Sequence, residues 1–217
     1  MRYRTIASKR IGLPVLFVMA ILTGSARTQN QTPANSGPSL ALTMRWIQDT
    51  LNDRGSVTYV DSTNLGKDGI VTSNVSTRVS GAVVDAASCT LHWTTTMDMS
   101  GPGPDDHAQT ATTTIVPLKD IESVVVQSGR EREGQTSSTH SPEFYAVTLV
   151  SSKAVIRMRT TVKITSEFKD SDPPPQDFDK TVPTETILIP DEDTAHRLAK
   201  SLTVAVKLCG RGNKDSF

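Results

Sequence analysis

The sequence predicts a mainly β domain (β-rich α+β) over residues 40–210, with seven to eight short antiparallel strands between an N-terminal helix and a capping C-terminal helix. Apolar residues recur at helical spacing only in the first and last segments of this region. Between these segments, short runs alternate apolar and polar residues and are separated by turn-forming stretches. Strands that follow one another in this way pair as an antiparallel barrel or bent sheet.

Residues 1–26 predict a cleaved secretory signal peptide. Met1–Arg10 carries four positive charges and no acidic residue, and the apolar run Ile11–Leu22 follows it. This run of 12 residues is shorter than the roughly 20 that a membrane-spanning helix needs. Small residues then precede a cleavage point after Ala26. We expect a secreted or periplasmic protein with no membrane insertion after cleavage; the alternative is an uncleaved N-terminal anchor.

The charge of the mature chain argues against two classes of partner. The full sequence has 23 basic and 23 acidic residues, but Arg2, Arg4, Lys9 and Arg10 lie in the predicted signal peptide. Without these four the chain has 19 basic residues and a net charge of −4. A mildly acidic protein without a basic stripe is poorly suited to bind nucleic acid or an anionic membrane surface.

Leu40–Arg54 predicts the N-terminal helix, after a polar, flexible leader over residues 27–39. Ser39 is a suitable N-cap, and Gly55 is expected to end the helix. The apolar residues that share helical spacing are Leu40, Met44, Ile47 and Leu51.

Period-two alternation predicts the strands, and Cys89–Met97 is the clearest of them. Leu91 and Trp93 share the apolar face of this strand with its cysteine. Phe144–Val150 and Ala154–Ile164 together predict a hairpin. The other predicted strands are Val57–Val60, Ile70–Ala82, Thr110–Val116, Ser123–Gln127 and Glu185–Ile189.

Three long polar segments are predicted as loops: Ser100–Gln109, Ser128–Pro142 and Ser166–Thr184. The last of them contains three consecutive prolines, which cannot occupy a central strand. Long loops on a β scaffold often carry function. We therefore expect a ligand or partner to bind at these loops.

Asp191–Gly210 predicts an amphipathic C-terminal helix, followed by a tail over residues 211–217. Asp191 opens the helix, and Gly210 is expected as the residue that ends it. Val204 and Leu208 lie on the outer side and predict either a partner contact or a second apolar stripe covered by a loop or the N-terminal helix. The residues predicted to face the core are Ala195, Leu198, Ala199, Leu202, Val206 and Cys209.

The order of elements resembles the pleckstrin-homology-like (PH-like) arrangement, in which a seven-stranded bent barrel is closed by a C-terminal helix. This resemblance implies an architecture and no particular function, because such a fold serves many uses. Cys89–Trp93 (CTLHW) and Lys207–Gly210 (KLCG) are also similar to segments of uncharacterised secreted bacterial proteins. That similarity covers residues 40–210 and implies no activity, since the family has no assigned function.

The two cysteines predict a disulfide between Cys89 and Cys209. An exported protein meets an oxidising compartment, and both residues fall on predicted core faces. Closing a loop of this length contributes at most ~4–5 kcal/mol in chain-entropy terms. The alternative is a pair of buried free thiols. A catalytic thiol is disfavoured because there is no CxxC motif and the strand position points inward.

No catalytic, metal or cofactor site is predicted. The motifs GxSxG and SxxK, phosphate-binding loops and dinucleotide fingerprints are absent from the sequence. A Ser/His/Asp site built from distant residues requires a geometry that no spacing here indicates. The nearest thing to a cation-binding cluster is Asp105-Asp106-His107, which we interpret as a solvated polar loop and not as a metal site. The four histidines, none of them paired at metal-ligand spacing, are His92, His107, His140 and His196.

These observations favour a non-enzymatic binding or interaction module with an unknown protein or small-molecule partner. One alternative is an extracytoplasmic hydrolase whose catalytic residues are dispersed along the chain. Another is a lipocalin-like carrier of a small apolar ligand, which requires a hollow barrel. Converging polar side chains in a concave pocket would indicate the hydrolase, whereas a filled barrel with polar loop tips would indicate the module.

Overall fold

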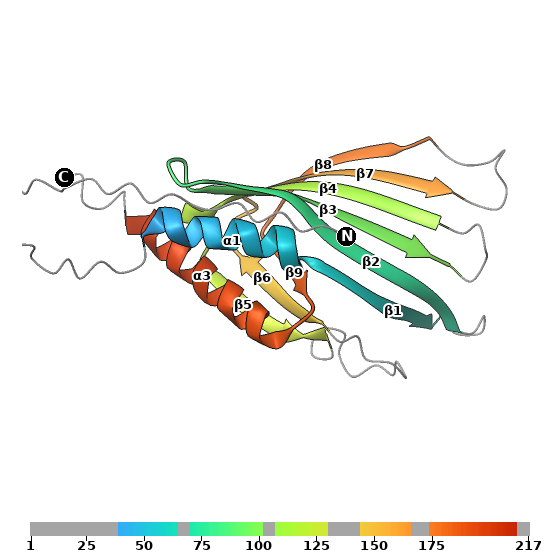
Figure 1. The fold of residues 1–217 in the computed structure, drawn as a ribbon. Helices are drawn as coiled ribbons and strands as arrows, with labels where there is room; N and C mark the ends of the chain where they lie inside the picture. The colour runs from blue at the N-terminus through green and yellow to red at the C-terminus, as the bar shows by residue number, and fades with distance from the viewer. Residues whose placement is uncertain (1–38, 65–69, 102–106, 130–143, 166–173, 212–217) are drawn as a thin grey trace, which may run out of the picture. The chain divides into compact units, whose positions relative to one another are not determined.

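The computed structural model describes residues 39–64, 70–101, 107–129, 144–165 and 174–211 of the 217-residue chain (Figure 1). In these residues two α-helices flank a series of nine β-strands. The helices are α1 (Leu40–Arg54), the 3-10 helix η2 (Leu118–Asp120) and α3 (Glu192–Arg211). The strands are β1 (Ser56–Asn64), β2 (Ile70–Asp85), β3 (Thr90–Ser100), β4 (His107–Pro117), β5 (Ser123–Ser128), β6 (Tyr145–Val150), β7 (Ile156–Thr165), β8 (Gln176–Val182) and β9 (Thr184–Ile189).

The strands form two antiparallel sheets (Figure 1). The large sheet has the order β1-β2-β3-β4-β7-β8, and the small sheet has the order β5-β6-β9. The predicted mainly β class is confirmed, but the described strands do not close into a barrel. After β4 the chain turns away through η2, so that β5 and β6 pair with β9 instead of extending the large sheet.

The predicted hairpin between Phe144–Val150 and Ala154–Ile164 is wrong. β6 pairs with β5 and β9 in the small sheet, whereas β7 pairs with β4 and β8 in the large sheet. The chain crosses between the sheets just after β6, where the Ser151 N–H donates a hydrogen bond to the Pro183 carbonyl at 2.8 Å. Alternation predicts which face of a strand is apolar but not which strand it pairs with. The apolar faces of β6 and β7 meet the same core from different sheets, so the pattern of each strand fits either arrangement.

The segment Ser166–Thr184, predicted as a loop, contains the strand β8. β8 follows the prolines and pairs with β7 at the edge of the large sheet. Its residues are exposed except for the half-buried Val182, and Phe178 is the one large apolar side chain among the exposed ones, so its sequence gives little apolar alternation. Charged residues on an edge strand are a common protection against pairing with another chain.

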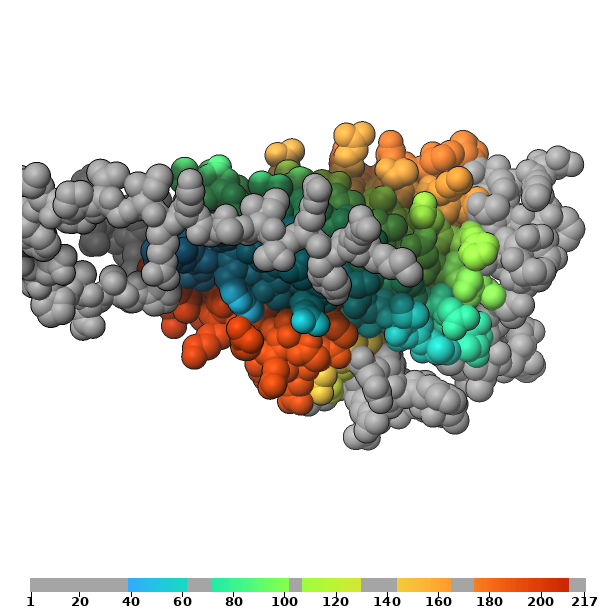
Figure 2. Space-filling view, viewed as in Figure 1, coloured from blue at the N-terminus to red at the C-terminus, as the bar shows by residue number. Residues whose placement is uncertain are grey.

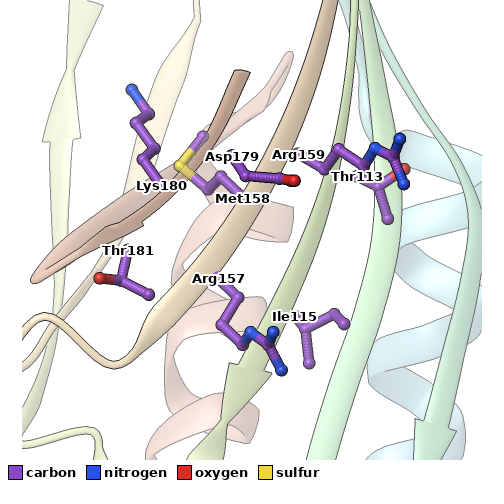
Figure 3. A pocket seen from close by; sticks show the side chains of 8 residues that line it. All are labelled: Thr113, Ile115, Arg157, Met158, Arg159, Asp179, Lys180 and Thr181. Atoms are coloured by element: carbon purple, nitrogen blue, oxygen red, sulfur yellow. The ribbon is translucent and has the colours of Figure 1, made fainter. Parts of the chain in front are cut away.

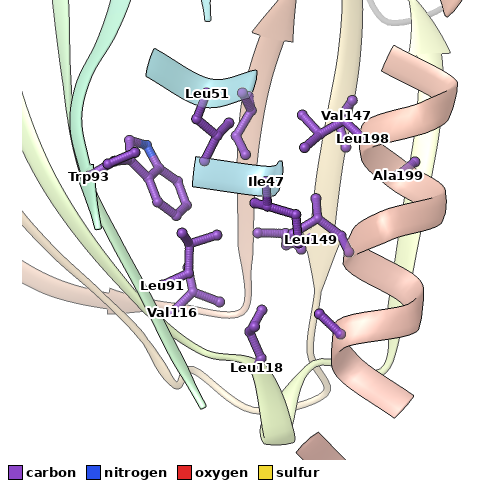
Figure 4. Close-up of a cluster of buried hydrophobic side chains, with 14 of the residues drawn as sticks. Ile47, Leu51, Leu91, Trp93, Val116, Leu118, Val147, Leu149, Leu198 and Ala199 are labelled. Carbon is purple, nitrogen blue, oxygen red and sulfur yellow. The ribbon is translucent and has the colours of Figure 1, made fainter. Parts of the chain in front are cut away.

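The core lies where the two sheets and both helices meet (Figure 4). Leu91 and Trp93 of β3 are fully buried there, together with Ile47 and Leu51 of α1 and Leu198 of α3. The helix α1 packs on β2, α3 packs on η2, β5 and β6, and the two helices contact each other. The face of the large sheet that carries Trp93 is called the inner face below, and the opposite face is called the outer face.

Both ends of α1 are as predicted. The Leu42 N–H donates to the Ser39 hydroxyl oxygen at 3.3 Å, and the Gly55 N–H donates to the Leu51 carbonyl at 3.1 Å. Gly55 is also a close-approach position, since a Cβ atom built there would lie 2.6 Å from the Val79 Cβ atom. A side chain at residue 55 would therefore push α1 away from β2.

The helix α3 begins as predicted and ends later. The Thr194 N–H donates to Asp191 Oδ1 at 2.8 Å, and this hydrogen bond lowers the pKa of Asp191 below its usual value. The helix continues through Gly210 to Arg211, so the prediction that Gly210 ends it is wrong. Gly210 lacks the positive φ of a helix-ending glycine, and in the described chain Gly81 is the glycine that has one. The buried residues of α3 are Ala195, Leu198, Ala199, Leu202, Ala205 and Cys209.

Ala205 joins the predicted buried face of α3, while Val206 is only half-buried. The reason is the contact with α1, which lies alongside α3 and shifts the covered face toward it. Val204 is also half-buried and lines a groove with α1 residues. Both alternatives predicted for the outer apolar stripe, a partner contact and coverage by a loop or the N-terminal helix, stay open for Val204.

Cys89 lies in the β2–β3 turn and not in the strand, which begins at Thr90. Its φ angle is 54°, and it is the non-glycine residue with positive φ in the described chain. The turn is held by Asp85, whose Oδ1 accepts the N–H of Ala87 at 2.9 Å, while the Ser88 hydroxyl donates to Oδ2 at 2.6 Å and lowers the pKa of Asp85. The Cys89 carbonyl accepts the Leu118 N–H at 2.9 Å.

Candidate functional site

The large sheet carries a continuous apolar row across the inner face of five strands. Tyr59, Val75, Met99, Ala108 and Ile164 are consecutive Cα partners on β1, β2, β3, β4 and β7. Directly paired residues in an antiparallel sheet point to the same face and lie side by side. The row is absent from the hydrophobic core cluster, and its exposure rises along it: Val75 is 2% exposed, whereas Ile164 is 45% exposed. The Tyr59 ring lies 4.9 Å from that of the buried Phe144. This strip is called the apolar row.

Opposite the apolar row, the outer face of the large sheet is polar. The residues one step along each strand are Thr58, Ser76, Asp98, Gln109 and Lys163, and they are likewise consecutive partners. Gln109 Nε2 donates to Asp98 Oδ1 at 2.7 Å within this row. The sheet therefore stays amphipathic beyond the core, and an amphipathic sheet is stabilised when its apolar face is covered.

A cavity of about 240 Å³ lies next to the apolar row, between the inner face of the large sheet and β9. We call it the trough cavity. Met97 and Met158 supply flexible apolar side chains to its wall, and Tyr59 belongs to both the cavity and the apolar row. Its other lining residues are Gly55, Thr77, Val79, Thr95, Thr110, Thr112, Glu185, Thr186, Ile187 and Leu188.

The two sheets are joined at the inner end of this cavity by a hydrogen bond. The Thr114 hydroxyl of β4 donates to Glu185 Oε1 of β9 at 3.3 Å, and Thr114 is fully buried. Glu185 is the charged residue among those that line the trough cavity. Thr112 exchanges a hydrogen bond with Thr160 at 2.9 Å, so part of the hydroxyl lining is fixed by neighbours on the sheet.

A larger depression of about 610 Å³ lies near β4, β7 and β8 (Figure 3). Arg157 and Arg159 lie on the outer face with Thr113, while Met158 and Lys180 project to the other side (Figure 3). Arg159 Nη2 is 4.0 Å from Asp177 Oδ2, and both side chains are more than half exposed. Exposed ion pairs of this kind are worth little, so the depression is adequately explained as a solvated sheet face.

A third hollow, of about 450 Å³, is lined by residues of α1 and α3. Figure 2 shows the two helices next to each other, α1 in blue above α3 in orange-red. Trp46 lies on α1, and the guanidinium carbon of Arg197 on α3 is 5.3 Å from the centroid of its ring. This distance is that of a cation–π contact. The other lining residues are Leu42, Thr43, Lys200, Ser201 and Val204.

The predicted disulfide is present and joins Cys89 to Cys209, with Cα atoms 5.7 Å apart. Neither sulfur is a thiol, so neither cysteine is a nucleophile. The disulfide fastens the end of α3 to the β2–β3 turn, at the end of the core away from the apolar row.

The predicted histidines lie on separate elements where the structure describes them. His92 is on the outer face of β3, and His107 is exposed at the start of β4. His196 Nε2 is 3.7 Å from Glu192 Oε1 on the surface of α3. His140, Asp105 and Asp106 lie outside the described residues, as do the central parts of the three predicted loops. The described residues include no group of three or more His, Cys, Asp or Glu residues placed to hold a metal ion.

The trough cavity was not predicted from the sequence. A signal existed, because Met97 and Met99 continue the alternation of Leu91 and Trp93 beyond the length of strand that the core can cover. Alternation alone does not reveal how long the covering elements are. The contribution of β9 through Glu185 depends on contact between the sheets, and no local pattern reports such a contact.

Comparison with protein-family models, with curated proteins and with solved structures yields no match to this chain. Within the ranges that the structure describes, neither helix combines the length and the apolar character needed to cross a membrane.

Proposed function

We propose that this protein is an exported binding module that holds a small apolar or amphipathic molecule in the trough cavity and along the apolar row. The observation that carries the proposal is the amphipathic sheet itself, whose inner face continues past the core cluster as paired apolar residues and ends at the exposed Ile164. This proposal joins the expected binding module to the alternative of a carrier, with an open cavity between two sheets in place of a hollow barrel.

The lining of the trough cavity suits an apolar ligand of variable shape. Burial of apolar surface is worth roughly 25 cal/mol per Å², and Met97 and Met158 can adapt to different shapes because their side chains are unbranched and polarizable. The volume of about 240 Å³ is below the common range for drug-sized ligands, roughly 300–1,000 Å³. A longer molecule would continue from the cavity along the apolar row.

The hydroxyl groups of the lining would orient a polar end of such a ligand. Thr77, Thr95, Thr110 and Thr112 occupy the inner face of three neighbouring strands. Threonine hydroxyls both donate and accept hydrogen bonds. A ligand with an apolar part and a hydroxyl or amide group matches this lining better than a pure hydrocarbon does.

Export and a PH-like relationship are parts of the same proposal. The tripartite segment over residues 1–26 supports export, and the disulfide is of a kind that persists in oxidising compartments. Antiparallel strands in series followed by α3 support the PH-like relationship. The hydrolase alternative has weaker support, because the described histidines lie on separate elements.

The test uses the neutral dye N-phenylnaphthylamine, whose fluorescence rises in apolar surroundings, with purified protein after removal of bound lipid. Thr110→Trp places a large side chain on the inner face of β4 inside the cavity. Ala111→Trp places the same side chain one residue along, on the outer face of the same strand. Wild-type protein and Ala111→Trp are expected to bind the dye saturably, and Thr110→Trp about tenfold more weakly or not at all.

The melting temperature of each variant shows whether it folds. If Thr110→Trp does not fold, Met97→Phe serves as a second variant that fills the cavity. Equal dye binding by the cavity and outer-face variants would place the dye elsewhere and contradict the proposal. So would the absence of saturable binding to the wild-type protein. If the dye binds as expected, mass spectrometry of an organic extract from protein purified from its host would identify the natural ligand.

A further inference from the structure

The hollow between α1 and α3 combines an apolar floor with two cations. Leu42 of α1 is 69% exposed, and Trp46 and Val204 are half-buried beside it. Arg197 and Lys200, both exposed, stand on the α3 side. No carboxylate is among the described residues that line this groove. We call it the interhelical groove.

The Arg197 side chain is held over the groove by its contact with Trp46. A cation that rests on an indole ring is already oriented, so less side-chain entropy is lost when it binds an anion. Arg197 also helps to lower the pKa of Asp191, after the Thr194 hydrogen bonds and Arg54, and it is therefore within electrostatic reach of the start of α3. Lys200, one turn further along α3, adds the second charge at the helix spacing of i,i+3.

We propose that the interhelical groove is a docking site for an acidic peptide segment of a partner protein, one that carries apolar residues at helical spacing with Glu or Asp beside them. A helix laid between two helices buries an apolar stripe in the groove, and its flanking carboxylates meet Arg197 and Lys200. Leu42 and Trp46 then become apolar anchors, of the kind that dominate binding energy in such grooves.

A peptide fits the groove better than a membrane surface does. Two basic residues supply only about 2 kcal/mol of attraction to an anionic bilayer. The site is also a hollow of about 450 Å³, which accepts side chains from a partner, whereas an interfacial helix presents a convex apolar face to lipid. This site is distinct from the trough cavity and shares no lining residue with it.

The test uses synthetic helical peptides of stated composition with the purified wild-type protein. The probe has a Leu stripe at i, i+3, i+4 and i+7 with Glu at the flanking positions, and in the matched peptide each Glu is replaced by Lys. Trp46 reports binding through its fluorescence, and Trp46→Phe removes that signal while the fully buried Trp93 remains. We expect the Glu peptide to bind more tightly than the Lys peptide, with an affinity that falls as salt increases.

Charge reversal identifies the site. Arg197→Glu with Lys200→Glu is expected to weaken the Glu peptide by about tenfold and to strengthen the Lys peptide. Lys153→Glu, an exposed change just before β7, is the matched control and should leave both affinities unchanged. Equal binding of the two peptides, or binding insensitive to the charge reversal, overturns the proposal. Retention on anionic phospholipid vesicles that depends on Arg197 and Lys200, without peptide binding, overturns it in favour of a lipid surface.

Discussion

Cys89 and Cys209 are 120 residues apart in the chain, and their disulfide joins the β2–β3 turn to the last turn of α3. The Cys89 carbonyl also accepts the Leu118 N–H of η2, so one residue connects the large sheet, η2 and α3. These contacts hold the start of β3, η2 and the end of α3 together at one end of the core.

Removal of the disulfide by Cys89→Ala with Cys209→Ala is expected to lower the free energy of unfolding by about 2–5 kcal/mol, because the unfolded chain is no longer closed into a loop. Urea denaturation at neutral pH measures the change. Wild-type protein treated with a reductant should lose a similar amount. An unchanged denaturation midpoint in both samples would contradict the stabilising role of the bond.

Two glycine-to-alanine substitutions should have opposite effects. Gly55→Ala is expected to destabilise by about 1–3 kcal/mol, since the new Cβ atom would lie 2.6 Å from both the Leu51 carbonyl oxygen and the Val79 Cβ atom. Gly210→Ala is expected to stabilise by about 0.5–1 kcal/mol, because Gly210 is helical and a Cβ atom there meets nothing within 4 Å. Thermal denaturation of the two variants beside the wild type compares them, and equal shifts would refute the account.

The lowered pKa of Asp191 predicts that the protein loses stability in acid. Its folded-state pKa is lowered from 3.8, chiefly by the backbone N–H of Thr194. A group whose pKa falls on folding contributes stability above its unfolded pKa, and this contribution is lost as the pH falls through the folded pKa. Asp191→Asn keeps a capping side chain without a titrating carboxylate. Between about pH 5 and about pH 3, the free energy of unfolding of Asp191→Asn should therefore vary less with pH than that of the wild type.

Asp191→Ala is the matched variant at the same position. It removes the hydrogen bond to Thr194 altogether and should cost about 1 kcal/mol at neutral pH, where Asp191→Asn costs little. Urea denaturation across the pH series separates the two effects. Wild-type pH dependence in Asp191→Asn would assign the acid sensitivity to other carboxylates.

If the proposed signal peptide is cleaved after Ala26, the mature chain begins at Arg27. Intact-mass measurement of protein secreted by its host, together with N-terminal sequencing, tests this. Ala26→Phe should block cleavage, because the signal peptidase requires a small residue before the cut. A full-length chain recovered from the membrane fraction would instead support the alternative of an uncleaved anchor.

Helix ends and buried faces were predictable from local chemistry. Ser39, Gly55 and Asp191 cap their helices through hydrogen bonds to neighbouring residues, and such bonds depend only on nearby sequence. The disulfide was predictable because a chain with two cysteines has one possible intramolecular pairing. Cys89 itself was misplaced by one residue, since its positive φ is held by contacts with Leu118 and Cys209.

Periodicity along the chain predicted both α-helices and every described strand except β8, together with the apolar face of most of them, because helix and strand periods are local properties. Only the tertiary structure decided which strands pair, and it placed β6 and β7 in different sheets. Only the tertiary structure also decided how far the core reaches along the large sheet. The apolar row lies past that limit, so Met99 and Ile164 have the pattern of core residues while standing at the edge of an open cavity.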